Sequence, residues 1–450
     1  MLMKIQKKQF IKITRLILII TAFFSPFGSY FIKNQNTYLI HPSLEIFSSE
    51  ISDMSSAPSI GYSYRTNITY NLQYNWTFWY GSMATENVEM WFPLIQNHTH
   101  PQMSGVGPQQ ESNLLLNVSN YEDFSLPDYN FDPEDDYNNS YEYFGINLNQ
   151  YSQDFSYNSS YDITLRELVW DVDSNNIGEY DPIDPLFVNN TGPEDYLNTL
   201  DPDLIDLSNE ICLGKSTVLA KARAVYDWMI DDNNLVYDIQ NVEQSASDFY
   251  ISRVGDCSEF SNLMVTLLRI QDIPARKVVG LTILDGNLED GFKPIKNPIK
   301  GQSWYYVEKF RYNQEIIELN IPGHAWIEYY IPGYGWIPCD PTWGYGGGDY
   351  FNRIDASHIT WNVGQNFGGG IDPQLPGTAT EMSIVPSLWC NQIDQVAFDL
   401  EIRVKVLNSE YYYNSTLWIL VAVLIIVSIV SLIIYVTIRS RQKKQLETAY

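Results

Sequence analysis

Apolar side chains recur at every second residue in several parts of the chain, and this period predicts β-strands with one buried face. The longest stretch is strongly aromatic and runs through Ile68, Tyr70, Leu72, Tyr74, Trp76, Phe78 and Tyr80. Shorter alternations surround Met90 and Ile163. Together they predict a β-rich, sandwich-like domain over residues 34–193, in which the aromatic stripe forms core rather than a carbohydrate-binding surface.

The period changes to that of a helix in the middle of the chain. Apolar residues stand there at i, i+3, i+4, i+7 and i+8, namely Phe260, Leu263, Met264, Leu267 and Leu268. With Asp256 before them and Pro274 after, they predict a helix that begins at Cys257 and buries one broad face. A later alternation from Val396 to Val406 predicts a long strand, which either completes the first β domain or forms its own module.

Both ends of the chain carry an apolar run beside basic residues. Leu16–Phe24 follows a basic start and precedes small residues, so residues 1–33 are predicted to be a signal peptide or an uncleaved N-terminal anchor. Leu417–Ile438 holds 22 uncharged residues and precedes Arg439 and Arg441. It predicts a transmembrane helix over 416–438, after a juxtamembrane segment over 371–415 and before a cytoplasmic tail over 439–450.

The charge distribution agrees with this topology. The chain has 27 Lys and Arg against 54 Asp and Glu, a net charge of −27, which repels phosphate backbones and excludes nucleic acid as a partner. Ten of the basic residues lie in the first 33 and last 12 positions, so the part between is strongly acidic. That part holds the Asn-X-Ser/Thr sequons at Asn67, Asn75, Asn97, Asn117, Asn138, Asn158, Asn189 and Asn414. The sequence predicts a cell-membrane glycoprotein, single-pass or two-pass, with its folded part outside the cell.

Cys257 is the candidate nucleophile. Backbone N–H groups and the positive end of the helix dipole stabilise a thiolate at a helix start, and the N–H of Cys257 is the expected oxyanion donor. A structural cysteine is the better interpretation unless a base lies nearby. We expect Cys212, Cys339 and Cys390 to be buried thiols or to form at most one disulfide.

The candidate base lies in a predicted hairpin. The strand that begins at His324 turns at residues 332–335 and returns to Asp340. If Tyr330 pairs with Trp336 across a five-residue loop, Asp340 lies diagonal to His324 on one face, whereas a four-residue loop places them on opposite faces. We predict the longer loop, because a carboxylate that reaches the second imidazole nitrogen fixes the tautomer of the base.

Three ordered blocks resemble the core of the transglutaminase-like superfamily. They are Arg253-Val-Gly-Asp-Cys257-Ser-Glu-Phe-Ser with the later Ile273-Pro-Ala-Arg276, then His324-Ala-Trp-Ile-Glu, then Gly335-Trp-Ile-Pro-Cys-Asp340-Pro-Thr-Trp. The resemblance covers roughly residues 195–367 and implies a papain-related α+β fold over 194–370. It places the nucleophile on the central helix and the other two triad members, His324 and Asp340, on adjacent antiparallel strands.

Other candidate sites are weaker. Cys257, His324 and Asp340 lack the paired spacing of zinc motifs, so we expect neither a metal nor another cofactor. The acidic residues 132–136 are interpreted as a solvated loop rather than a calcium site. His358 could approach the cleft, and we interpret it as an ordinary structural histidine.

The family includes cross-linking acyltransferases, cysteine proteases, peptide N-glycanases and members without catalysis. Membrane-anchored microbial members with a preceding β domain resemble this chain in layout and are mostly assigned as proteases. We therefore expect an extracellular thiol enzyme that attacks a protein or peptide substrate through a thioester, as a cysteine peptidase or amidase. The alternatives are a protein-glutamine acyltransferase and a non-catalytic binding or adhesion module.

Overall fold

The structure is a computed structural model that describes residues 62–80, 87–98, 109–120, 137, 139–147, 154–240, 242–285, 293–295, 297–311, 315–364, 387–390, 396–412 and 415–448. The predicted signal segment and the acidic residues 132–136 lie outside these ranges. The described elements all belong to one compact unit, Ile60–Tyr450.

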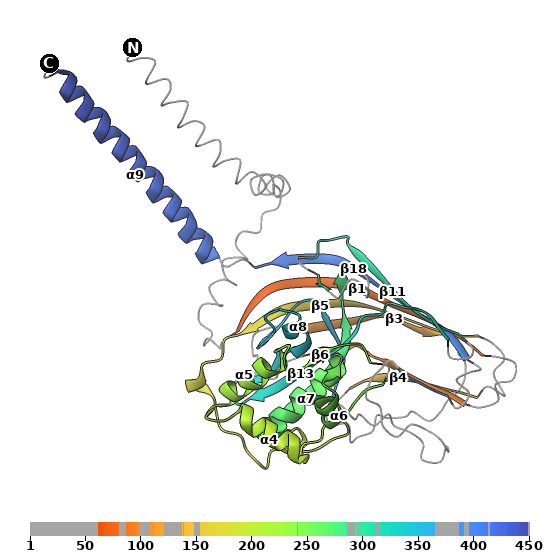
Figure 1. Ribbon diagram of the computed structural model, residues 1–450. Helices are drawn as coiled ribbons and strands as arrows, with labels where there is room; N and C mark the ends of the chain where they lie inside the picture. The colour runs from red at the N-terminus through yellow and green to blue at the C-terminus, as the bar shows by residue number, and fades with distance from the viewer. Residues whose placement is uncertain are drawn as a thin grey trace. The chain divides into compact units, whose positions relative to one another are not determined.

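A seven-stranded antiparallel sheet forms the larger β layer (Figure 1). Its strand order is β12 (Glu315–Leu319), β11 (Ser303–Arg311), β18 (Val396–Tyr411), β1 (Tyr62–Tyr80), β5 (Phe155–Trp170) and β15 (Arg353–Ile354), with β3 (Gln110–Ser119) also paired to β5. The long C-terminal strand therefore completes the first β region. The sheet draws strands from all three segments that the sequence analysis separated at residues 193 and 370, and those boundaries stay predictions.

The aromatic stripe of β1 packs against a second, three-stranded sheet. Its order is β17 (Ser387–Cys390), β2 (Asn87–Pro93) and β4 (Tyr141–Asn147). The rings of Trp76 in β1 and Phe92 in β2 have centroids 5.0 Å apart, and Tyr70 and Phe78 are fully buried. The stripe is core, as predicted, and the two sheets form sandwich-like layers.

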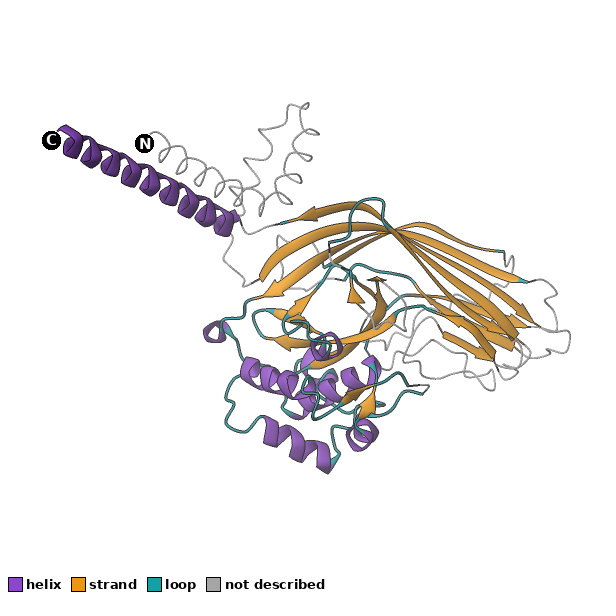
Figure 2. Cartoon of the chain, turned by 45° about the horizontal axis from the view of Figure 1, so that its top comes forward, coloured by secondary structure: helices purple, strands orange, loops and turns teal. Residues whose placement is uncertain are grey.

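A four-stranded sheet and a group of helices form the remaining core. The sheet order is β14 (Gly335–Cys339), β13 (Gly323–Ile331), β8 (Ala275–Thr282) and β16 (His358–Val363). Figure 2 shows most of the helices gathered beside it. The helical elements are η1 (Ser174–Asn176), α3 (Pro185–Asn189), α4 (Pro202–Ile211), α5 (Val218–Met229), α6 (Ala246–Ser252), α7 (Cys257–Ile270) and α8 (Pro341–Tyr345). Short strand pairs join β6 (Val236–Tyr237) to β7 (Val254–Gly255) and β9 (Leu284–Asp285) to β10 (Lys293–Pro294).

Helix α7 begins at Cys257, as the sequence predicted. Its apolar face is fully buried and packs in one cluster with Trp326 and Ile327 of β13. Burial of this face against the sheet fixes the position of the helix start.

Two side-chain amides occupy the outer edge of β16. Gln110 of β3 donates to the Thr360 carbonyl at 2.9 Å and accepts from the Thr360 N–H at 2.7 Å. Asn139 makes the same pair of bonds with Val363, both at 2.8 Å. Because each amide offers both N–H donors and an acceptor oxygen, it takes the place of a neighbouring strand and links β16 to the β-rich layers.

Helix α9 (Ser415–Thr448) covers the C-terminal apolar run, and its side chains are described over residues 425–441. Within the described part of the chain, no helix combines the length and apolar character needed to cross a membrane. The transmembrane helix over 416–438 therefore stays a prediction.

Candidate active site

The chain around Cys257 holds this residue at the first position of α7. The carboxylate of Asp256 accepts from the N–H of Ser258 at 3.0 Å, and the side chain of Glu259 accepts from the N–H of Asp256 at 2.8 Å. This reciprocal capping box satisfies two backbone donors that a helix start otherwise leaves unpaired. The residue before Asp256 is Gly255. A Cβ at this position would lie only 2.6 Å from the Cβ of Glu259, so a larger residue does not fit there.

Cys257 differs from the other described cysteines in its exposure. All three described thiols are free, and Cys257 is partly exposed whereas Cys212 and Cys339 are buried. Burial raises the pKa of both buried thiols, which makes them poor nucleophiles. Cys212 and Cys339 are thus buried thiols, as expected, while the side chain of Cys390 lies outside the described residues.

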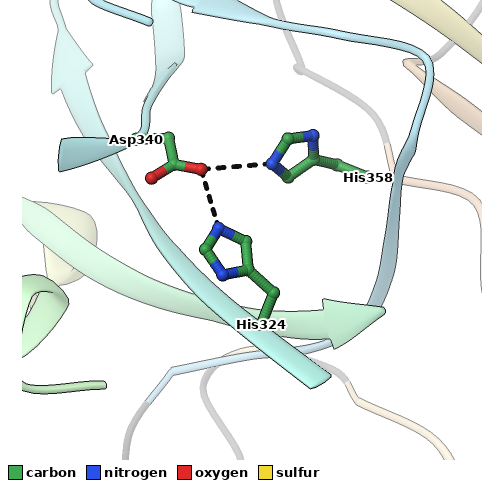
Figure 3. A group of neighbouring side chains, drawn as sticks. All are labelled: His324, Asp340 and His358. Carbon is green, nitrogen blue, oxygen red and sulfur yellow. Dashed lines mark hydrogen bonds and ion pairs between the residues drawn. The ribbon is translucent and has the colours of Figure 1, made fainter. Parts of the chain in front are cut away.

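The predicted hairpin register is confirmed. Tyr330 pairs with Trp336, and β14 ends at Cys339, directly before Asp340. The Nε2 atom of His324 lies 2.7 Å from Oδ2 of Asp340 (Figure 3). The longer loop therefore brings the imidazole and the carboxylate together, as the sequence analysis required.

Asp340 uses its second oxygen to cap α8. Its Oδ1 accepts from the N–H groups of Thr342 and Trp343, both at 2.9 Å. Burial would raise the pKa of this fully buried carboxyl, but the charges and hydrogen bonds of His324 and His358 outweigh that effect and lower it. Asp340 is therefore an ionised group with fixed orientation.

His324 carries its proton up to high pH. Burial alone would lower its pKa, but the charge of Asp340 and the hydrogen bonds to Asp340 and Cys257 raise the pKa to about 9. The rings of Trp326 and Trp343 lie at centroid distances of 6.0 and 5.8 Å from the ring of His324, which is buried. Because Nε2 is held by Asp340, Nδ1 is the nitrogen left for the thiol of Cys257.

The structure adds a residue that sequence reasoning undervalued. His358, at the start of β16, lies with Nε2 3.1 Å from Oδ2 of Asp340 and with Nδ1 2.8 Å from Oδ1 of Asp355. The sequence analysis noted that His358 could approach the cleft but interpreted it as an ordinary structural histidine, without this contact to Asp340. The available signal was Asp355, a carboxylate three residues before the histidine.

The residues that could hold a metal in the structure differ from the set considered in the sequence analysis. Among the described residues, His324, Asp340 and His358 bring one ligand atom each within 4.8 Å of one another. This set lacks Cys257, which the sequence analysis had combined with His324 and Asp340. Its two imidazoles already contact one carboxylate oxygen directly, so ion pairs and hydrogen bonds explain why these three side chains lie together.

The segment with this geometry matches a known family. Residues 205–341 match the family model described as transglutaminase-like superfamily. The match contains α7, β8, β13 and β14 with Cys257, His324 and Asp340. This segment belongs to the transglutaminase-like superfamily and has its mixed α/β fold, as the sequence blocks indicated.

Individual relatives share low sequence identity with this chain or cover only part of it. The uncharacterized protein YebA of Bacillus subtilis (strain 168) is 31% identical over 144 residues, which cover 30% of this chain and 17% of the relative's length. A solved protein of Cytophaga hutchinsonii, provisionally assigned as a cysteine protease, is 16% identical over 78% of this chain and 96% of its own, with a TM-score of 0.46. The periplasmic domain of TgpA from Pseudomonas aeruginosa is 15% identical over 60% of this chain and 94% of its own, with a TM-score of 0.30. The fold assignment therefore rests on the matched segment 205–341.

Proposed function

We propose that this chain is a membrane-anchored, extracellular thiol enzyme that attacks peptide or amide carbonyls, as a cysteine peptidase or amidase. The observation that supports this most strongly is the placement of His324, whose Nε2 is hydrogen-bonded to Asp340 and whose pKa is raised by Asp340 and also by Cys257. A thiol, a base and an orienting carboxylate in this order are what nucleophilic thiol catalysis requires.

The proposed reaction begins from the ion pair in which the proton of the Cys257 thiol already resides on Nδ1 of His324, whose pKa is raised to about 9. The sulfur bonds to the carbonyl carbon of a protein or peptide substrate, and the π electrons move to the oxygen. The N–H of Cys257, which donates no hydrogen bond among the described residues, is the oxyanion donor. When the C–N bond breaks, the imidazolium of His324 protonates the leaving amine, and water then hydrolyses the thioester.

A second candidate follows from the same thioester. If a primary amine takes the acyl group before water does, the enzyme is a protein-glutamine acyltransferase. A non-catalytic binding module is the alternative from a different class, and it requires an unreactive Cys257.

Anchoring in the cell membrane is proposed from the two ends of the chain. Large apolar side chains on every side of α9 are about half exposed over the described stretch from Ile425 to Ile438. A helix that is apolar all round and uncovered is typical of a membrane span, and the run it belongs to holds 22 uncharged residues before a basic tail. The acidic, sequon-bearing part then lies outside the cell.

The test offers both acceptors at once. Purified full-length chain is incubated with a mixture of peptides and a biotin-labelled primary amine, and mass spectrometry reads new peptide termini and amine adducts. New peptide termini would identify a hydrolase, and peptides that carry the labelled amine would identify an acyltransferase. Either product should disappear in the Cys257→Ser variant. It should persist in Cys212→Ala, the control that removes a buried thiol. Equal product from Cys257→Ser would contradict the proposal.

A further inference from the structure

His358 lies fully buried between two carboxylates. Its Nδ1 faces Asp355 and its Nε2 faces Asp340, at 2.8 and 3.1 Å. A neutral imidazole has one N–H and can donate to only one of them, so the arrangement requires the imidazolium, which donates to both. Burial alone would lower the pKa of His358, but the charges and hydrogen bonds of Asp355 and Asp340 raise it to about 9.

Asp355 is built to stay ionised. Its carboxylate accepts from the N–H of Ser357 at 2.8 Å, and from the hydroxyls of Ser357 and Tyr350, both at 2.5 Å. Burial would raise the pKa of Asp355, but His358 and these donors outweigh it and hold the pKa well below its usual range. His358 is therefore anchored on the side away from the triad.

The sheet leaves room for the two imidazoles to approach. His324 pairs with Gly280 of β8, and His358 pairs with Thr282 two residues along the same strand. Because Gly280 carries no side chain, the two imidazole centroids come to 5.5 Å although a strand separates them. Trp326 closes the gap, with its ring centroid 5.1 Å from that of His358.

We propose that His358, as an imidazolium clamped between Asp355 and Asp340, is a positioning residue that holds Asp340 in place for His324 and balances its charge. The inference rests on the proposed thiol chemistry and extends it. The groups that face His358 are Asp355 from the turn before β16, Tyr350 from the segment before β15, Asp340 from the β14–α8 junction, and His324 with Trp326 from β13.

This role predicts a change in the pH dependence of the thiol. With His358 charged, Asp340 shares its negative charge between two cations. If that charge is lost, Asp340 acts on His324 alone, and the imidazolium of His324 persists to higher pH. The alkaline limb of the profile, where His324 loses its proton, therefore moves to higher pH.

The experiment measures the alkylation rate of Cys257 by iodoacetate against pH in the full-length chain, with peptide mass spectrometry to identify the site. Iodoacetate is an anion, so it reports the thiolate–imidazolium pair and gives a bell-shaped profile. His358→Gln keeps a donor to Asp340 but removes the cation. Asp355→Asn keeps a polar partner for Nδ1 but removes the charge of Asp355, so that a neutral His358 can still donate from Nε2 to Asp340. His358→Leu removes both the donor and the charge.

We expect the alkaline limb of the bell to move to higher pH by about one unit in His358→Gln and Asp355→Asn. His358→Leu should in addition lower its maximum by about 10- to 100-fold, the range typical of lost outer hydrogen bonds to a functional histidine. His98→Gln is the matched control, because it makes the same substitution at another buried histidine that contacts a carboxylate, the 2.5 Å pair with Glu328 of β13. It should lower the melting temperature without moving the bell.

The outcomes separate this inference from the proposed function. A bell that stays in place in both His358→Gln and Asp355→Asn would overturn the positioning role, even if the melting temperature falls. If the wild-type chain shows no fast alkylation at any pH, the thiol-enzyme proposal itself fails. If His358→Leu does not fold, the two milder variants still decide the question.

Discussion

At the residue scale, Asp340 divides its two oxygens between structure and chemistry. Oδ1 accepts hydrogen bonds from two backbone N–H groups at the start of α8, and Oδ2 contacts the imidazoles of His324 and His358. The carboxylate is thus oriented by the backbone before it orients the base. In the proposed mechanism, this spares the enzyme reorganisation during the reaction.

The raised pKa values of two histidines predict a loss of stability toward alkaline pH. The pKa values of His324 and His358 rise from 6.5 to about 9 in the folded chain. Their contribution is therefore fully present below about pH 6.5 and is lost as the pH rises through about 9. Urea unfolding between pH 6.5 and 9 should show a falling free energy of unfolding, and His358→Gln should show a shallower slope. An identical slope in the variant would contradict the raised pKa of His358.

The sequence predicted some site residues and missed others for a physical reason. Cys257 was marked by its place at a helix start, and the pair of His324 and Asp340 by a hairpin whose register is local. The contact of His358 with Asp340 depends on β16 joining β8, which no local pattern encodes. Hence the contact of His324 with Asp340 was predicted, and the contact of His358 with Asp340 was not.

At the element scale, the same contrast holds. Helix α7 was predictable because its apolar spacing and its cap lie within one short segment. The position of β16 at the sheet edge depends on Gly280, where a Cβ would lie 1.9 Å from the carbonyl oxygen of Ile359. The close approach of β16 to β8 is therefore possible only with glycine at that point.

Gly280→Ala should push β16 away from β8. We expect a loss of several kcal/mol in the free energy of unfolding, of the size seen for severe overpacking, together with slower alkylation of Cys257 as His358 leaves Asp340. Gly323→Ala in β13 is the matched control for stability, because a Cβ there meets nothing within 4 Å. Thermal melts of both variants give the comparison, and equal melting temperatures would show that the approach of the strands is not limited by Gly280.

At the scale of the whole molecule, β16 connects the four-stranded sheet to the β-rich layers. Gln110 and Asn139 stand 250 and 224 residues from their partners in the chain. The two amides bind the backbone of the strand that carries His358, so the β-rich layers support the proposed site directly. Such distant pairings explain why the sequence indicated sheets but not how they are joined.

Gln110→Ala should therefore destabilise the molecule as a unit. It leaves the N–H and carbonyl of Thr360 without their amide partner, at a cost of about 1–3 kcal/mol for a buried group. We expect one calorimetric transition at lower temperature, whereas Asn113→Ala, on an exposed position of the same strand, should change stability by less than about 0.5 kcal/mol. Two separate transitions in Gln110→Ala would show that the layers fold independently.

The central claim is that Cys257 is an ion-paired nucleophile activated by His324. The most direct measurement is the alkylation rate of Cys257 by iodoacetamide near pH 6 in the purified full-length chain, beside His324→Ala. The ordinary thiol of Cys212, followed in the same digest, is the internal control. We predict fast labelling of Cys257 in the wild-type chain and a collapse of that rate in the variant. Slow labelling in both chains would contradict the thiol-enzyme account and favour a non-catalytic binding module.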